Sequence, residues 1–393
     1  MKSAVATPTA EKSARAETTL DEEPPGDRPP PFVSADVQVV GQSTSENGSP
    51  RPPRGIVVLY STTDKLNKGE SQDLLADLET IGTAKAVAQV LQQHTCFDIH
   101  LLPASRHVER ELSPFSPKDY LVFNLFEGID GFTGEEARAA FALNALGYRF
   151  TGARGHTLAL AVNKAQTKAL LAKSRILTPP WRVFSHRDEV SSSALGDMGF
   201  PLIVKPVAED SSLAIDAGAV VTDLDALRTR VAYVVEQYHQ EALVESFIDG
   251  REFNIAIWGN PPQVLPLAEV DLSAFSDPKE RIVSFAAKWQ EASFEYCHTP
   301  VICPAVTSDD LAARIRTTAL RVWEITGCSG YARVDMRVQN GNVYVLEVNP
   351  NPSLAPDAGF ARAARAAGFD YPRMILNILS LVGEDRHVCH SQG

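Results

Sequence analysis

The chain of 393 residues lacks several features that would assign it to a specialised class of protein. Its five cysteines, Cys96, Cys297, Cys303, Cys328 and Cys389, are scattered, and no two of them have a CxxC spacing. An odd number of scattered cysteines argues against a disulfide framework and against a cysteine zinc site. This usage fits a reducing compartment, and we therefore expect a cytoplasmic protein.

The sequence also has no long apolar run and no excess of basic residues. No apolar stretch approaches the roughly 20 residues that a membrane-spanning helix needs. The formal net charge is −12, whereas a general nucleic-acid binder needs basic surface to neutralise phosphates. We expect neither a membrane nor a nucleic acid as a partner, although a nucleotide could still bind in a local pocket.

The first 54 residues differ in composition from the rest of the chain. They are rich in Pro, Ser, Thr, Glu and Asp and contain no apolar segment of the kind that a secretory signal has. This composition predicts a disordered tail over residues 1–54, and we expect a flexible end over residues 385–393. The remaining length suggests two or three domains.

From residue 55 onward, strand and helix patterns alternate. Short β-branched runs predict strands and apolar residues at helical spacing predict helices. The expected strands are 55–62, 97–105 and 119–128, and the expected helices are 79–94 and 134–147. Such alternation is typical of a parallel sheet covered by helices, which we expect to form an N-terminal α/β domain over residues 55–153.

The second half of the chain has longer strand-rich stretches. Its expected elements are a helix at 158–174, a strand–loop–strand unit at 200–221, a helix at 224–239, strands at 241–248, 252–258, 263–272 and 281–289, a helix at 309–327, and a helical end at 359–382. Strands 331–338 and 342–349 are joined by an Asn-Gly turn, which favours a hairpin. We expect two further domains here, over residues 154–250 and 251–384.

The hairpin carries the strongest set of polar residues. Arg333 and Asp335 lie two apart on one strand, and Glu347 and Asn349 lie two apart on the other, so each pair shares a face. Two carboxylates and an amide suit Mg²⁺, and a nearby arginine suits the charge of a transferring phosphoryl group or an oxyanion. The alternative is a structural salt bridge across the strands from Arg333 to Glu347.

Lysines and hydroxyls upstream would complement such a metal site. Lys205 ends the apolar run PLIVK, where a buried lysine is costly unless it meets an anion. Ser211 and Ser212 follow in a polar loop that could cover phosphates. Lys164 is a second cation, for which a solvated helix face is the alternative.

The segment LVESFIDGREFNIAIW supplies a third group of candidates. Glu245 ends one apolar run, Glu252 begins the next, and Ile248 between them can offer backbone groups to a heterocycle. Taken alone, two such glutamates would be expected at a solvated strand end and turn. Their position between the lysines and the hairpin makes them candidates for nucleotide binding.

Taken in order, these motifs resemble the ATP-grasp superfamily and, within it, the D-alanine–D-alanine ligase family. The resemblance runs from about residue 55 to residue 381, and several motifs in one order are more specific than any single one. The motifs that carry it are FNLFEG, NKAQTKALL with TPP, PLIVKPVAEDSS, LVESFIDGREFNIAI, ARVDMRV and VYVLEVNPNPS. The resemblance implies an α/β and α+β architecture in which two domains clamp ATP between antiparallel sheets.

The resemblance also implies roles for individual residues. Lys164 and Lys205 would contact the phosphates of ATP beneath Ser211 and Ser212, and Lys288 would reach the terminal phosphate. Glu245 and Ile248 would contact the adenine, and Glu252 the ribose. The implied metal ligands are Asp335, Glu347 and Asn349, holding two Mg²⁺ ions, with Mn²⁺ as an alternative. Arg333 and the backbone N–H of Ser353 would stabilise the acyl phosphate and the oxyanion.

Three positions depart from the pattern of those ligases at the substrate end. Glu127 stands where they have a histidine, Ala358 stands where they have a clamping serine, and Glu79 is the nearest candidate for the glutamate that holds the first substrate's ammonium. The implied activity is an ATP-dependent ligation of a carboxylate and an amine, both expected to be small molecules of the amino-acid class. The alternatives are an ATP-binding regulatory protein and an ATP-grasp kinase. The resemblance is compatible with a homodimer.

Overall fold

The computed structural model of the protein describes residues 53–62, 68–129 and 134–382. The expected tail over residues 1–54, apart from its last two residues, and the expected flexible end over 385–393 lie outside these ranges. No helix within them is long and apolar enough to cross a membrane. The described residues form three β-sheets with helices packed on them.

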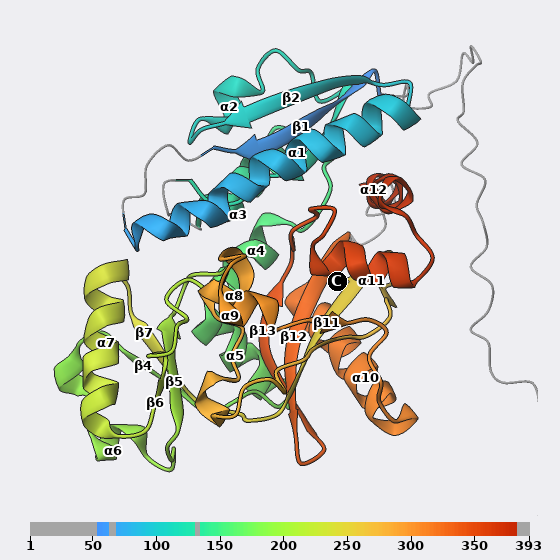
Figure 1. The fold of residues 1–393 in the computed structure, drawn as a ribbon. Coiled ribbons are helices and arrows are strands. Elements are labelled where there is room, and N and C mark those ends of the chain that lie inside the picture. The colour runs from blue at the N-terminus through green and yellow to red at the C-terminus, as the bar shows by residue number, and fades with distance from the viewer. Residues whose placement is uncertain (1–52, 63–67, 130–133, 383–393) are drawn as a thin grey trace, which may run out of the picture. The chain divides into compact units, whose positions relative to one another are not determined.

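The N-terminal sheet is parallel, as its alternating pattern predicts. Its strand order is β2-β1-β3. The strands are β1 (Gly55–Ser61), β2 (Asp98–Ala104) and β3 (Tyr120–Leu125), and the helices are α1 (Leu74–His94), α2 (Val108–Glu111) and α3 (Gly134–Ala145), with a short 3₁₀ turn at Ser71–Asp73. Figure 1 shows α1 as a long helix that runs beneath this sheet, and its N-terminal end lies near α7 (Leu224–Tyr238).

A second sheet is antiparallel and has the order β4-β7-β5-β6. Its strands are β4 (Trp181–Phe184), β5 (Leu202–Pro206), β6 (Val220–Val221) and β7 (Ala242–Ser246), and α6 (Ser192–Leu195), α7 (Leu224–Tyr238) and the 3₁₀ turn Arg187–Glu189 lie beside them. Val231 and Val234 on α7 pack on Val204 and Val244 of the sheet. This core leaves the opposite face of β5 and β7 for the cavity described below.

The largest sheet has the antiparallel path β11-β10-β8-β12-β13, with β9 paired to β8. Its strands are β8 (Arg251–Trp258), β9 (Gln263–Val264), β10 (Ala268–Val270), β11 (Val301–Ile302), β12 (Tyr331–Gln339) and β13 (Asn342–Asn349). Asn340 and Gly341 both have positive φ, of 50° and 77°, as the expected Asn-Gly turn requires. The hairpin prediction is confirmed.

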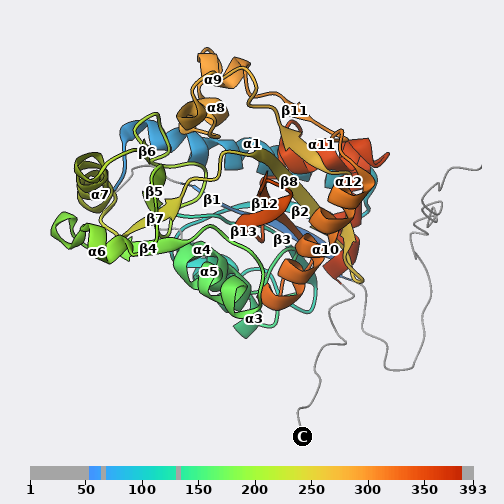
Figure 2. The same ribbon diagram turned by 90° about the horizontal axis from the view of Figure 1, so that it is seen from below.

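Helices cover both faces of this largest sheet. The helices in this part of the chain are α8 (Phe285–Trp289), α9 (Phe294–Cys297), α10 (Asp309–Thr326), α11 (Gly359–Ala366) and α12 (Tyr371–Ser380), with a 3₁₀ turn at Pro278–Glu280, and α10 and α11 pack on opposite faces of the sheet. Ile315 and Ala319 of α10 pack on one face, and Figure 2 shows α10 against this sheet and α7 against the smaller one. Trp258 and Phe360 join a second core that also includes α1 and α12. The N-terminal sheet is thereby packed onto the largest sheet.

Three expected elements differ from the structure. The expected strand 263–272 is two short strands, β9 and β10, separated by residues 265–267. The expected helix 158–174 is two helices, α4 (Gly155–Val162) and α5 (Lys164–Lys173), because Asn163 is extended and its side chain caps α5 by accepting a hydrogen bond from the backbone N–H of Gln166. The expected strand 281–289 contains α8 instead, where the Ser284 hydroxyl caps the helix through the N–H of Ala287. The break sets the direction of Lys164, and α8 carries Lys288.

The division into domains over residues 55–153, 154–250 and 251–384 stays a prediction. Each of the three sheets falls within one of these ranges. The described residues nevertheless belong to a single compact unit.

Candidate active site

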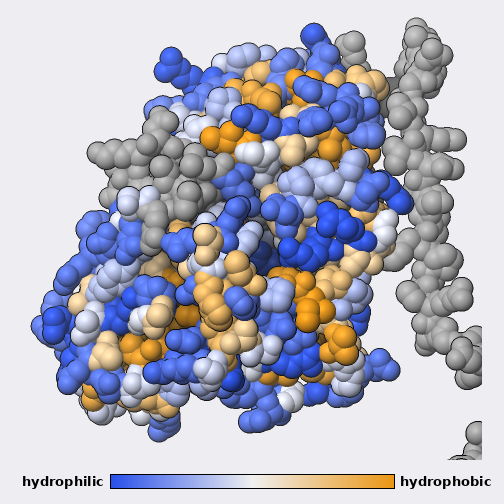
Figure 3. Space-filling view, in the orientation of Figure 1, coloured by the Kyte–Doolittle hydropathy of each residue, from blue (hydrophilic) through white to orange (hydrophobic). Residues whose placement is uncertain are grey.

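The candidate residues from all three parts of the sequence line one cavity of about 540 Å³. Figure 3 shows that the face seen in Figure 1 is hollowed at its centre and that hydrophilic residues surround the hollow. The predicted residues that line the cavity are Glu79, Glu127, Lys164, Lys205, Ser211, Ser212, Glu245, Ile248, Glu252, Lys288, Arg333, Asp335, Glu347, Asn349 and Ser353. The structure therefore brings the whole predicted set together.

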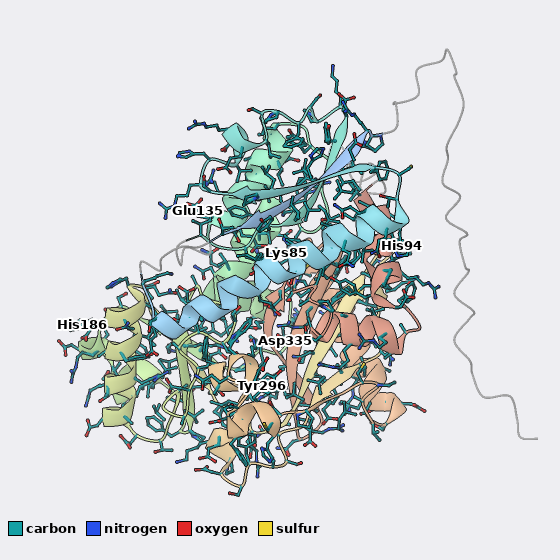
Figure 4. All side chains as sticks on the ribbon, turned by 45° about the horizontal axis from the view of Figure 1, so that its top comes forward. Lys85, His94, Glu135, His186, Tyr296 and Asp335 are labelled. Atoms are coloured by element: carbon teal, nitrogen blue, oxygen red, sulfur yellow. The ribbon has the colours of Figure 1, made fainter. Side chains whose placement is uncertain are left out.

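The hairpin places its polar side chains as the alternation of strand residues predicts. Arg333 is opposite Asn349 and Asp335 is opposite Glu347 across β12 and β13. Arg333 donates two hydrogen bonds of 2.8 Å to Asp335, one from Nε and one from Nη2. The alternative salt bridge from Arg333 to Glu347 is therefore replaced, among the described residues, by a bidentate pair on the same strand. Figure 4 places Asp335 centrally, beyond α1 from the N-terminal sheet.

Asp335, Glu347 and Asn349 form a donor set that fits a magnesium ion. The Asn349 amide nitrogen lies 2.9 Å from Asp335 Oδ2 and 3.4 Å from Glu347 Oε1, which leaves its oxygen for a metal. Asn254 on the neighbouring strand donates to Asp335 Oδ1 at 2.8 Å and fixes that carboxylate. Mg²⁺ uses one or two carboxylates and takes its other ligands from phosphates and water, which matches these residues.

Glu347 has an excess of positive charge around it. Burial alone would raise the pKa of its carboxyl group, but Lys164, Lys205 and Lys288, with Arg333, hold that pKa well below its usual range. Burial and the nearby Arg333 in turn lower the pKa of Lys288. Four cations around one carboxylate leave net positive charge, which is the environment that a polyphosphate chain requires.

Glu245 is shared by two lysines, one of which sequence reasoning missed. Its Oε1 lies 3.0 Å from Lys205 Nζ and 3.2 Å from Lys168 Nζ, and the carboxylate is almost fully buried. Burial opposes ionisation, but the two lysines lower the pKa of Glu245, whereas burial lowers the pKa of Lys168 to about 8. Lys168 follows Lys164 by four residues and so shares its helix face, a spacing that could have revealed it. The expected contact of Glu245 with adenine stays a prediction, and in the structure its carboxylate holds the two lysines.

Glu252 and Ile248 are both held by a second missed residue, Arg337. Its Nε and Nη2 donate to Glu252 Oε2 at 2.9 and 2.7 Å, and its Nη1 donates to the carbonyl of Ile248 at 2.7 Å. Arg337 is itself buried. It lies two residues beyond Asp335 on β12, so its side chain shares the face of the sheet that carries the hairpin constellation. The resulting network fixes the strand end and the turn together.

The loop after β5 has an unusual backbone. Ser211, Ser212 and Ala214 all have φ between 50° and 60°, although none is glycine. Non-glycine residues in this left-handed region are held there by their surroundings. Here the Ser212 hydroxyl donates to Val283 O at 2.8 Å and the Trp289 indole donates to Ser211 O at 3.0 Å. The loop is thereby fastened to α8, over the cavity.

The end of the cavity beside α1 is acidic. Glu79 hydrogen-bonds with Ser353, and its pKa is raised by burial and by Asp357. Burial raises the pKa of Glu127 well above its usual range, and Thr80 donates to this carboxylate at 3.0 Å. Glu136, a further missed residue, accepts from Asn351 at 2.8 Å. No local pattern marked Glu136, because it lies on an ordinary helix.

Comparison with known proteins adds to this geometry. The family model described as the C-terminus of D-Ala–D-Ala ligases matches residues 170–380. A D-alanine–D-alanine ligase of Moorella thermoacetica is 30% identical over 312 residues, covering 77% of this chain and 93% of the relative. An uncharacterized protein, y4sG, of Sinorhizobium fredii is 33% identical over 68% of this chain and 76% of the relative.

Solved structures show the same fold. The D-alanine–D-alanine ligase of Bacillus anthracis, complexed with ATP, has a TM-score of 0.66 and 21% identity, covering 84% of this chain and 98% of that one. The fold is therefore the ATP-grasp fold, as the resemblance implied. The chain belongs to the D-alanine–D-alanine ligase family, and the expected class, an ATP-dependent ligase that forms a C–N bond, is confirmed.

Proposed function

We propose that this protein uses Mg-ATP to join a small-molecule carboxylate to an amine, with both partners of the amino-acid class. The observation that carries the proposal is the convergence of Arg333, Asp335, Glu347 and Asn349 with Lys164, Lys205 and Lys288 around one cavity. A non-catalytic ATP-binding protein would need the lysines but not the arginine.

In the first step, a carboxylate oxygen of one substrate attacks the γ-phosphorus of ATP, the bond from that phosphorus to ADP breaks, and an acyl phosphate forms. Lys164, Lys205 and Lys288 neutralise the phosphates, and phosphoryl transfer of this kind depends mainly on positioning and electrostatics. Mg²⁺, when bound by Asp335, Glu347 and Asn349, would offset the charge that develops on the phosphate oxygens.

In the second step, the amine nitrogen attacks the acyl carbon, the bond to phosphate breaks, and a proton leaves the nitrogen. Arg333 is held by Asp335 in a fixed orientation, so its guanidinium can stabilise the oxyanion without reorganising. The Ser353 backbone N–H is the proposed second donor. The fastened loop at Ser211 and Ser212 would keep water from the acyl phosphate.

The proposal is tested by following ADP and phosphate release from Mg-ATP with L- and D-amino acids, singly and in pairs, with the product mass measured in parallel. We expect ADP, phosphate and a condensation product in equal amounts. A phosphorylated product formed without an amine would indicate a kinase. ATP binding without turnover across the panel would favour a regulatory ATP-binding protein.

A further inference from the structure

Four carboxylates converge at the end of the cavity beside the N-terminal sheet. Glu79 comes from α1, Glu127 follows β3, Glu136 comes from α3, and Asp210 comes from the loop after β5. All four line the cavity. None of them is among the residues that hold ATP or metal in the proposed function, so their presence needs a separate explanation.

These four carboxylates differ from Glu245, Glu252 and Asp335 in forming no ion pair with a described residue, although Lys288 acts on Glu79 and Asp210 at longer range. Glu245, Glu252 and Asp335 are each paired with lysine or arginine. Within the described part of the chain, no lysine or arginine lies within ion-pair distance of the four carboxylates. Three of them accept hydrogen bonds from the neutral side chains of Ser353, Thr80 and Asn351 instead.

The four groups also act electrostatically on one another. The pKa of Glu127 is raised first by burial and then by Asp210, Glu136 and Glu79. Burial, opposed by Asn351 and assisted by Asp210, raises the pKa of Glu136 to about 8. Carboxylates gathered in a partly desolvated space retain protons unless a cation lies among them, so a cationic ligand would stabilise the ionised form of this group.

A small adjoining cavity supplies an independent sign of a polar ligand. It has a volume of about 10 Å³ and shares Glu127, Asn351 and Ser353 with the main cavity. Thr83 and Asn124 line this cavity, and both residues are buried, with exposed fractions of 5% and 1%. Neither Thr83 Oγ1 nor Asn124 Nδ2 has a hydrogen-bond partner among the described residues. Buried polar atoms are nearly always satisfied. The space is close to what one water molecule needs, so a water or a ligand group beside Glu127 completes this corner.

A single metal ion does not fit the acidic end. No group of three or more His, Cys, Asp or Glu in the described ranges is arranged to hold a metal. The four carboxylates come from four separate elements in the wall of the cavity. An organic cation with separated charges matches that distribution better than an ion does.

We propose that this end of the cavity selects a basic amino acid, with a second ammonium group at the end of its side chain, as the substrate that supplies the carboxylate. The inference rests on the proposed ligase function for the fate of that carboxylate. Glu79 bonds to Ser353 and lies near Lys288, so it faces the reacting end and receives the α-ammonium group. Glu127 and Glu136 receive the side-chain ammonium, and Thr83 can accept a further hydrogen bond from it.

The test compares ornithine with norleucine, which has a methyl group where ornithine has the side-chain ammonium. Binding of both enantiomers of each is measured by calorimetry on the full chain with Mg²⁺ and a non-hydrolysable ATP analogue. Sites built to hydrogen-bond a substrate N–H strongly reject analogues that lack it, so we expect a preference for ornithine of roughly 100-fold or more. Equal or tighter binding of norleucine, or no binding of either, would overturn the inference.

Isosteric variants test the assignment to particular residues. Glu127→Gln and Glu136→Gln should each reduce the preference for ornithine by about tenfold, because each removes one charge-assisted hydrogen bond. Glu135→Gln is the matched control, since Glu135 pairs with Arg138 and is labelled in Figure 4 on the N-terminal part, away from Asp335. An unchanged preference in both cavity variants would contradict the assignment.

ADP release in the same samples tests the proposed function separately. Ornithine binding without ADP release in the presence of any amine would leave the charge selection standing and remove the ligase mechanism. ADP release and condensation with neutral amino acids, but not with ornithine, would leave the ligase standing and overturn the inference.

Discussion

The two ends of the cavity are built on opposite electrostatic principles. At the ATP end, Glu245 is paired with Lys205 and Lys168, Asp335 is paired with Arg333, and four cations act on Glu347. At the other end, Glu127 and Glu136 face carboxylates and neutral donors. The ion pairs at the ATP end hold its side chains in place before a ligand binds. At the other end, a cationic ligand would itself supply the ion pairs when it binds.

This difference separates the common part of the reaction from the specific part. ATP and its phosphates are the same in every ligase of this fold, so a rigid, paired site serves all of them. The substrate end decides which molecule is activated, and its charge is the feature that can reject an uncharged analogue. Substitutions at either end of the cavity test this difference separately.

The largest expected effect is on Glu347, the carboxylate that four cations surround. Glu347→Gln should lower ADP formation by on the order of 10³-fold, about 4 kcal/mol in the barrier, because metal-assisted charge stabilisation contributes several kcal/mol. Steady-state ADP release measures it, and circular dichroism verifies folding. Glu324→Gln, an exposed carboxylate on α10, is the control. Turnover like that of the wild type would remove Glu347 from the metal site.

A slightly smaller effect is expected for the buried pair at the ATP end. Glu245→Gln should lower the free energy of unfolding by about 3 kcal/mol, because Lys168 and Lys205 lose their shared carboxylate while glutamine still accepts a hydrogen bond. Denaturant titration measures the change, and the exposed neighbour Glu241→Gln serves as control. A loss no larger than that of the control would mean that the pairing does not rigidify this end.

Arg333→Lys tests whether geometry or charge matters beside the metal ligands. The substitution keeps the charge but loses the two-point contact with Asp335. We expect kcat to fall by about 10²-fold with little change in the KM for ATP, as for loss of an oxyanion donor. Arg316→Lys on the exposed face of α10 is the control. A rise in KM with unchanged kcat would instead assign Arg333 to ATP binding.

The smallest effect concerns pH and the unpaired end. The pKa of Glu136 is raised from 4.5 to about 8, so between these values the folded protein retains a proton that the unfolded chain has lost. The free energy of unfolding should therefore fall as pH rises through this window. Glu136→Gln should remove the part of this fall that Glu136 causes, measured as a weaker decrease of Tm from about pH 5 to pH 8.5. The same slope in Glu136→Gln and Glu135→Gln would show that Glu136 is not the source.

Much of the ATP end could be predicted because its signals are local. Strand alternation places Asp335 and Arg333 on one face of the sheet, and the Asn-Gly turn pairs their strand with that of Glu347 and Asn349. The lysine at the end of the apolar run PLIVK predicts an anion beside it. These are patterns of neighbours along the chain, and backbone geometry alone converts them into positions in space.

Other features escaped the sequence because they depend on competing local preferences. The apolar spacing through Asn163 fits one continuous helix, but the Asn163 side chain caps the N-terminus of α5 instead. Lys164, the first residue of α5, then lines the cavity. Residues 281–289 have the apolar content of a strand, but Ser284 caps a short helix there. In both cases a single side chain–backbone hydrogen bond decided between two elements that the pattern allowed.

By itself, then, the sequence determined the parallel N-terminal sheet and the charged hairpin, which follow from periodicity and turn chemistry, and its motifs implied the ATP-grasp plan by resemblance. Only the tertiary structure decided that Glu79, Glu127, Glu136 and Asp210 meet around one space. They come from four separate elements, and nothing in the spacing of residues along a chain encodes which helix ends and loops will face one another. That convergence depends on the packing of α1 and α12 that joins the N-terminal sheet to the largest one.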